Sequence, residues 1–251
     1  MALTIEISEE AGVRSLHFGS DWVQGAMRIA RPFALELEYT REMMAALLFR
    51  PDGAWPRRAL LIGLGAGSLA KFLWRHRPQA KLTVVEIDPA VVPAARQYFK
   101  LPDDPDRIHI QIGDGAHYLA RSGPAFDLIL VDGFDANARP GQLDTEAFYL
   151  NCKARLSDTG ILSTNLLSRR KDYRVSLERI GAAFDGRALS FPSCGSGNAI
   201  AFAATGETVK MTTAELKATA LALKKDTGLN LLPTLVRLEQ ARTFRGGELV
   251  L

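Results

Sequence analysis

The sequence LLIGLGAGSLAKFLWRH, residues 60–76, places three glycines at alternate positions directly after a run of aliphatic residues. The aliphatic run predicts a buried strand, and the amphipathic residues that follow predict a helix that ends before Pro78. Gly63, Gly65 and Gly67 would then lie where a strand turns into a helix. Glycine lets the backbone turn sharply at such a point and approach a ligand closely.

The spacing of the glycines distinguishes two kinds of ligand. A dinucleotide-binding loop of the form G-x-G-x-x-G would need glycine at position 68, where this chain has Ser68. The observed G-x-G-x-G spacing favours a nucleoside over a pyrophosphate. For the loop taken alone, a plain strand-to-helix turn remains the alternative.

Composition excludes several classes of protein. The chain has 251 residues, of which 47% are apolar, so it can bury a large core, and its formal charge of +3 does not indicate a nucleic-acid partner. Cys152 and Cys194 lack the spacing of a disulfide framework or a zinc site. The N-terminus is acidic and no stretch approaches the length of a membrane span. We therefore expect a cytoplasmic protein that binds neither metal nor membrane.

Short aliphatic runs alternate with amphipathic stretches from residue 58 onward, which predicts a parallel sheet covered by helices. After five such strands the order changes, because residues 187–193 and 198–205 flank the turn sequence CGSG and predict an antiparallel hairpin. The first fifty residues predict a β-hairpin arm over 14–29 and a helix that begins near Tyr39. The expected strands of the sheet cover residues 58–65, 81–88, 107–114, 126–134 and 160–167.

Helix boundaries also follow from local signals. Asp88 followed by Pro89 predicts a cap and a first helical residue, and the helix should continue to about Phe99. Thr212 or Thr213 should cap a helix near the C-terminus that stops close to Gly228.

Acidic residues follow the second and third expected strands. Glu86 ends the second strand, where a carboxylate can accept both hydroxyls of a ribose. Asp114 and Gly115 end the third, where a carboxylate can meet an adenine amino group and glycine leaves room for the ring. Each carboxylate alone could equally cap a helix or lie on the surface. Together with the glycine loop, they predict an adenosine site at one edge of the sheet.

The fourth strand ends in Asp132, and Asp135 follows three residues later. Both side chains can point into the same crevice. The alternatives are a turn-forming aspartate at 132 and a solvated one at 135. Because reactive groups of α/β enzymes gather at strand ends, we favour a functional role for both.

Several motifs together resemble the spermidine synthase (polyamine aminopropyltransferase) family between about Arg14 and Leu167. The matching segments are VQGAM, YTREMM, GLGAGS, VEIDP, GDG, VDGFD and RPGQL. The resemblance implies the fold of class I S-adenosylmethionine-dependent transferases. This is an α/β fold with a seven-stranded, mostly parallel, doubly wound sheet that ends in an antiparallel hairpin, here with a short N-terminal β arm. Residues 1–50 would form the arm and its helix, and residues 51–251 the catalytic domain.

The resemblance also implies an activity, the transfer of an aminopropyl group from decarboxylated S-adenosylmethionine to an amine such as putrescine, without a metal. Asp132 would be the catalytic base and Asp135 would bind the amine. Gln24 and Tyr39 would line the pocket from the N-terminal arm. The nucleoside would be held by Gly63, Gly65, Gly67, Glu86, Ile87, Asp114 and Gly115.

The chain departs from the family at Ala66, where the family's G-G-G-D-G loop has the aspartate that binds the amino group of the aminopropyl chain. Ala66 favours a second hypothesis, a methyltransferase that uses intact S-adenosylmethionine, and a third is a non-catalytic nucleoside-binding protein. Glu36 and Glu38 could supply replacement charge, although we favour a solvated face of an arm strand for them. The N-terminal part is shorter than the β-domain through which many family members form tetramers, so we expect a homodimer or a monomer.

Overall fold

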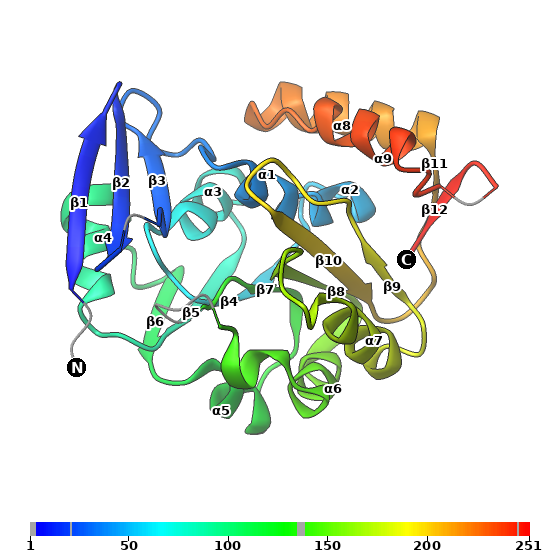
Figure 1. The fold of residues 1–251 in the computed structure, drawn as a ribbon, viewed down its shortest axis with the longest axis horizontal. Coiled ribbons are helices and arrows are strands. Elements are labelled where there is room, and N and C mark those ends of the chain that lie inside the picture. The colour runs from blue at the N-terminus through cyan, green and yellow to red at the C-terminus, as the bar shows by residue number, and fades with distance from the viewer. Residues whose placement is uncertain (1–3, 21, 135–138, 245) are drawn as a thin grey trace.

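A computed structural model describes residues 4–20, 22–134, 139–244 and 246–251 of the protein. Its centre is a seven-stranded sheet with the order β6-β5-β4-β7-β8-β10-β9 (Figure 1). The first five strands in this order are parallel, and β10 runs antiparallel to both of its neighbours. The bounds are β4 Arg58–Ile62, β5 Lys81–Glu86, β6 Ile108–Ile112, β7 Phe126–Val131, β8 Leu156–Leu167, β9 Ala188–Ser190 and β10 Asn198–Ala204. The predicted fold class, including the final antiparallel hairpin, is confirmed.

Two layers of helices cover the sheet because successive side chains of a strand point to opposite faces. In β4, Leu60 and Ile62 pack into one apolar cluster, and Ala59 and Leu61 pack into the other. One face carries α5 (Gly115–Ala120), α6 (Glu146–Ala154) and α7 (Tyr173–Ala183), which lie below the sheet in Figure 1. The other face carries α1 (Glu38–Met43), α2 (Ala46–Phe49), α3 (Ser68–His76), α4 (Val91–Phe99), α8 (Thr213–Thr227) and α9 (Leu232–Gln240).

The N-terminal arm is larger than the hairpin expected from the sequence. The hairpin is present as β2 (Val13–Phe18) and β3 (Gly25–Arg28), and β1 (Ile5–Glu10) adds a third antiparallel strand. Alternate residues of β1 pack against Leu16 of β2, which explains why this weakly patterned segment is ordered. The helix expected near Tyr39 begins at Glu38.

Two predicted helix boundaries had different outcomes. Asp88 does not cap α4: its carboxylate accepts the N–H of Ala90, and the helix begins only at Val91. Thr212 does cap α8, in a reciprocal capping box with Glu215, and Gly228 ends this helix at φ +76°. Beyond the helix, α9 and a strand β12 (Glu248–Val250) paired with β11 (Lys210–Thr212) were not foreseen.

Candidate active site

A cavity of about 560 Å³ lies at the carboxyl ends of β4, β5, β7 and β8, and the segment before α1 closes its other side. This edge of a parallel α/β sheet is where ligands bind. The cavity wall contains these residues predicted from the sequence: Gln24, Tyr39, Gly63, Gly65, Glu86, Ile87, Asp114, Gly115 and Asp132. Gly67 is not part of the wall, because it caps α3 and packs towards Leu101. Asp135 lies outside the described residues.

The glycine loop approaches the catalytic edge closely at Gly63. This residue has φ +91°, and a Cβ added to it would lie 2.2 Å from the backbone oxygen of Asp132. A side chain would therefore need both a strained backbone and a shift of β7. Gly63 consequently sets the distance between the loop and the end of β7.

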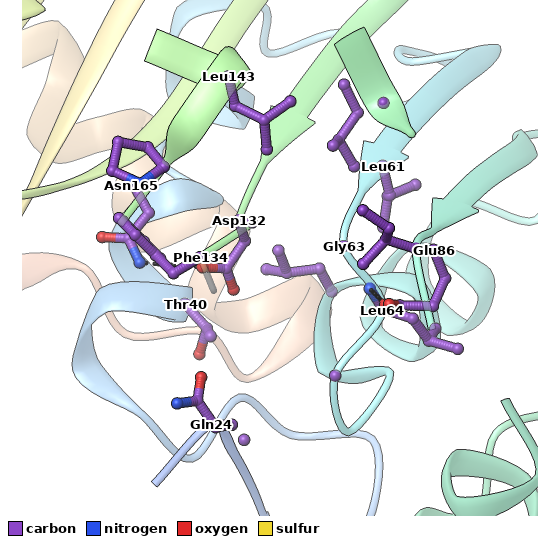
Figure 2. A pocket seen from close by; sticks show the side chains of 18 of the residues that line it. Gln24, Thr40, Leu61, Gly63, Leu64, Glu86, Asp132, Phe134, Leu143 and Asn165 are labelled. Carbon is purple, nitrogen blue, oxygen red and sulfur yellow. Dashed lines mark hydrogen bonds between the residues drawn. The ribbon is translucent and has the colours of Figure 1, made fainter. Parts of the chain in front are cut away.

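Glu86 is a buried carboxylate held by the backbone. Its Oε2 accepts the N–H of Leu64 at 2.8 Å, and its Oε1 accepts the N–H of Asp88 at 3.0 Å. Burial raises the pKa of Glu86, and these backbone hydrogen bonds oppose the rise. The carboxylate is thus fixed in orientation at the cavity wall, as Figure 2 shows.

The cavity wall beyond β5 and β6 is polar at Asp114 and apolar at Ile87. Asp114 caps α5 by accepting the N–H of His117 at 2.9 Å, which is the structural role that the sequence left open for it. The same residue also lines the cavity. Ile87 is 68% exposed, and its side chain leaves an apolar surface at the cavity mouth. Such a surface suits the face of a planar ring.

Asp132 accepts hydrogen bonds on both carboxylate oxygens. The Tyr39 hydroxyl donates to Oδ2 at 3.1 Å, and Nδ2 of Asn165 donates to Oδ1 at 2.9 Å. Burial raises the pKa of Asp132, and these two donors counteract that effect. Burial and the neighbouring Asp132 raise the pKa of Tyr39 far above its ordinary value, so this hydroxyl stays protonated and donates.

Asn165 was missed in the sequence analysis, as was Asn198, which donates to it at 2.9 Å. Both line the cavity, and Figure 2 shows Asn165 beside Asp132. The signal was present in residues 160–167, where three consecutive polar residues interrupt an aliphatic run at the end of the fifth strand. Of the three, Asn165 lines the cavity, whereas Ser163 donates to the backbone oxygen of Met43.

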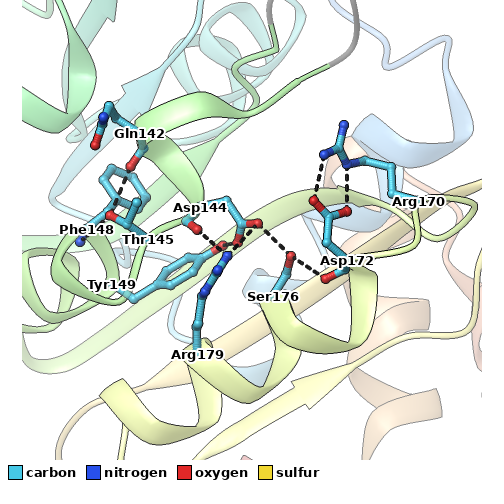
Figure 3. A network of polar contacts seen from close by, with 9 residues as sticks. All are labelled: Gln142, Asp144, Thr145, Phe148, Tyr149, Arg170, Asp172, Ser176 and Arg179. Atoms are coloured by element: carbon cyan, nitrogen blue, oxygen red, sulfur yellow. Dashed lines mark hydrogen bonds and ion pairs between the residues drawn. The ribbon is translucent and has the colours of Figure 1, made fainter.

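A 3-10 helix, η1 (Gly141–Asp144), continues the wall after the end of β7, with Leu143 facing the cavity. Asp144 is buried behind it and accepts from the Tyr149 hydroxyl at 2.9 Å and the Ser176 hydroxyl at 2.7 Å, as Figure 3 shows. Arg179 forms an ion pair with the same carboxylate at 3.3 Å. These contacts attach the wall to α6 and α7.

Ala66 is 2% exposed and packs in an apolar cluster with Leu16, Met27 and Phe99 of the arm and α4. Glu36 pairs with Arg28, whereas Glu38 lines the cavity and pairs with Arg237 of α9 at 3.1 Å. Neither glutamate lies on a strand, so the expectation of a solvated strand face is wrong for both.

Within the described ranges, no group of three or more acidic, histidine or cysteine side chains is arranged to hold a metal ion. None of the helices in that part of the chain combines the length and apolar character needed to traverse a lipid bilayer.

The doubly wound sheet and its antiparallel end define a methyltransferase-like fold, and an acidic cavity lies at its strand ends. Residues 37–172 match the spermine/spermidine synthase domain. A polyamine aminopropyltransferase from Chromobacterium violaceum is 38% identical over 248 residues, 98% of this chain and 94% of that protein. The chain therefore belongs to the spermine/spermidine synthase family.

Two solved structures show how widely this fold is used. A spermidine synthase in complex with the transition state analogue AdoDATO has 24% identity and a TM-score of 0.59, covering 90% of this chain and 88% of that one. Human methyltransferase-like protein 13 in complex with SAH has 28% identity and a TM-score of 0.68, covering 84% of this chain and 95% of that one. The fold is thus shared by a spermidine synthase and a methyltransferase-like protein.

Proposed function

We propose that this protein transfers an aminopropyl group from decarboxylated S-adenosylmethionine to an amine acceptor such as putrescine. The observation that carries the proposal is Asp132, hydrogen-bonded by Tyr39 and Asn165 in the same cavity as Glu86. The family and the aminopropyltransferase relatives support it.

The acceptor needs a proton acceptor beside it. An alkylammonium with a pKa near ~10.4 is not nucleophilic at pH 7, and freeing its lone pair costs about 4.6 kcal/mol at ~1.36 kcal/mol per pKa unit. The Asp132 carboxylate attracts the cation and then accepts its proton. The carboxyl side chains of the cavity also reduce the repulsion between the acceptor and a sulfonium.

The reaction is a single displacement. The acceptor nitrogen attacks the carbon next to the sulfonium, a C–N bond forms and the C–S bond breaks. The electron pair of the broken bond passes to sulfur, which leaves as the neutral thioether of methylthioadenosine, and the proton passes to Asp132. Orienting nitrogen and carbon in line can lower such a barrier by roughly 7–11 kcal/mol.

We assign the nucleoside to the wall made by Gly63, Gly65, Glu86, Ile87, Asp114 and Gly115, with Gly67 turning the chain into α3. Glu86 would accept the ribose hydroxyls and Asp114 the adenine amino group. Gln24, Tyr39 and Asp135 would contact the amine. The residues that we assign to the nucleoside line one cavity at adjoining strand ends, and this supports the assignment.

Ala66 supports a second candidate, methyl transfer from intact S-adenosylmethionine. A buried ammonium without its carboxylate partner would cost about 3–5 kcal/mol, a hundredfold or more in affinity. The burial of Ala66 among apolar side chains offers no replacement charge at that position. Calorimetry with decarboxylated and intact S-adenosylmethionine separates the candidates by which donor binds more tightly.

The decisive assay incubates the protein with decarboxylated S-adenosylmethionine and a panel of amines, including putrescine. We expect methylthioadenosine to be released, and we expect Asp132→Asn to lose this release while it still binds methylthioadenosine. No release across the panel would reject aminopropyl transfer. An Asp132→Asn protein with every affinity and activity unchanged would support a non-catalytic nucleoside-binding role.

We also propose that the protein acts in the cytoplasm as a homodimer on small amines, with no nucleic acid or membrane partner. Its two cysteines are both free thiols and buried, which fits a reducing compartment. Sedimentation of the purified chain tests the dimer.

A further inference from the structure

Asp132 is connected to a chain of side-chain hydrogen bonds whose members all line the cavity. Asn165, which is 5% exposed, donates from Nδ2 to Asp132 at 2.9 Å. Its own Oδ1 accepts from Nδ2 of Asn198 at 2.9 Å, and Oδ1 of Asn198 accepts from the Ser196 hydroxyl at 2.6 Å. Residues 165 and 198 lie on the adjacent strands β8 and β10.

Each hydrogen bond in this series runs from donor to acceptor in one direction, towards Asp132. A carboxamide can present either its oxygen or its NH₂ group to a neighbour, and an ionised carboxylate accepts only from the NH₂ group. Because Asn198 donates to the oxygen of Asn165, the NH₂ group of Asn165 is turned towards Asp132. The Ser196 hydroxyl donates to the amide oxygen of Asn198, which leaves the NH₂ group of Asn198 directed at Asn165.

We propose that Asn165 is a positioning residue for Asp132 and that Asn198 acts through it, so that the base is held ionised and aimed at the acceptor nitrogen. With Tyr39 on one oxygen and Asn165 on the other, the carboxylate has two donors that favour its charged form. This inference rests on the proposed role of Asp132.

The acid limb of kcat/KM against pH reports the ionisation of Asp132 in the free protein. One hydrogen bond to a charged group corresponds to a shift of about one pH unit or somewhat more. We therefore expect Asn165→Leu to move the acid limb upward by about that amount. Asn198→Ala should move it less, because Asn165 still reaches Asp132 but is free to flip. The double variant should match Asn165→Leu alone, because in the part of the chain that the structure describes Asn198 reaches the base through Asn165.

Ser163→Ala is the matched control. Ser163 is buried two residues earlier on β8 and donates to the backbone oxygen of Met43, so its loss should lower stability and leave the acid limb in place. Thermal unfolding of every variant identifies those that do not fold.

A second measurement separates this inference from the proposed function. Carbon NMR of proteins labelled at aspartate carboxyls, with Asp132→Asn used to assign the signal, gives the pKa of Asp132 without turnover. If the wild type is inactive and the pKa still rises in Asn165→Leu, the positioning role stands and the proposed function fails. An unchanged pKa in folded Asn165→Leu, or additive effects of the two asparagine substitutions, would overturn the inference.

Discussion

The ion pair between Arg237 of α9 and Glu42 of α1 offers the sharpest test of what holds α1 at the wall of the cavity. Glu42 has an exposed fraction of 0% and also accepts the Thr234 hydroxyl at 3.1 Å. Arg237 bridges it to Glu38, the carboxylate one position before Tyr39. Replacing Arg237 by methionine keeps the apolar stem and removes the charge from a buried partner.

The expected cost is large because the remaining carboxylate has no counter-charge. Breaking a buried pair on one side costs about 3–5 kcal/mol. For a domain of this size each kcal/mol lowers the Tm by roughly 2–4 °C, so Arg237→Met should lower it by about 6–20 °C. The loss should also depend on pH. Burial raises the pKa of Glu42 and Arg237 lowers it, so without the arginine this pKa rises further.

The sign of this pH dependence follows from linkage. In Arg237→Met the folded pKa of Glu42 lies above the unfolded value, so the folded state holds the extra proton between the two values. The variant should therefore recover stability relative to the wild type as the pH falls from 7 towards 5. Urea unfolding at both pH values measures this recovery.

Two matched variants complete the experiment. Arg96→Met removes an arginine from the exposed pair with Asp103 and should cost at most about 1 kcal/mol. Glu42→Gln combined with Arg237→Met should regain most of the stability, because position 42 then carries no buried charge. The reasoning is refuted if Arg237→Met costs no more than Arg96→Met, or if its cost is the same at pH 5 and pH 7.

Three further predictions follow from other contacts. Glu86→Gln should weaken binding of methylthioadenosine by about 10- to 100-fold in calorimetry, because the carboxylate that we assign to the ribose loses its charge; an unchanged affinity would contradict that assignment. Burial lowers the pKa of Lys71 to about 7, whereas the unfolded side chain keeps its ordinary value. Wild-type stability should therefore gain a contribution as the pH rises from 7 to 10, and urea unfolding of Lys71→Met should lack it. Asp144→Ala should leave the Tyr149 hydroxyl without its acceptor and Arg179 without this ion pair, whereas Ser176 keeps the backbone oxygen of Asp172. We expect a cost of about 1–3 kcal/mol in thermal unfolding, and a smaller loss would show that water replaces the carboxylate.

The sequence was sufficient for the sheet because each strand is a local aliphatic run and each strand end carries its own motif. Residues 60–62 and 81–86 are of this kind, and the glycine loop and Glu86 follow directly from them. The relay from Asp132 through Asn165 to Asn198 was not predictable in this way. Its members are 33 residues apart at each step, and only the register between β8 and β10 brings the two asparagines together.

The same reason explains why Glu38 was misjudged. Glu38 looks like a surface residue in a short acidic segment, and its partner Arg237 is 199 residues away on a helix that local patterns did not reveal. When a charged side chain pairs with a residue far away in the sequence, the residues next to it in the sequence do not reveal the pair. Ala66 differs, since its departure from the family loop was visible in the sequence, and the structure adds that the apolar arm packs against it.

The partners of the cavity's carboxylates separate binding from catalysis. Glu86 is held by two backbone N–H groups, and the carboxylate of Asp114 accepts one at the start of α5. Backbone donors of this kind cannot rotate away, so these two groups are suited to hold a ligand in a fixed place. Asp132 is held instead by the side chains of Tyr39 and Asn165, which donate to its carboxylate without carrying a charge themselves. Neutral side-chain donors suit a carboxylate that must gain and lose a proton in each cycle, and this difference in environment between the acids of the site supports the role that we propose for Asp132.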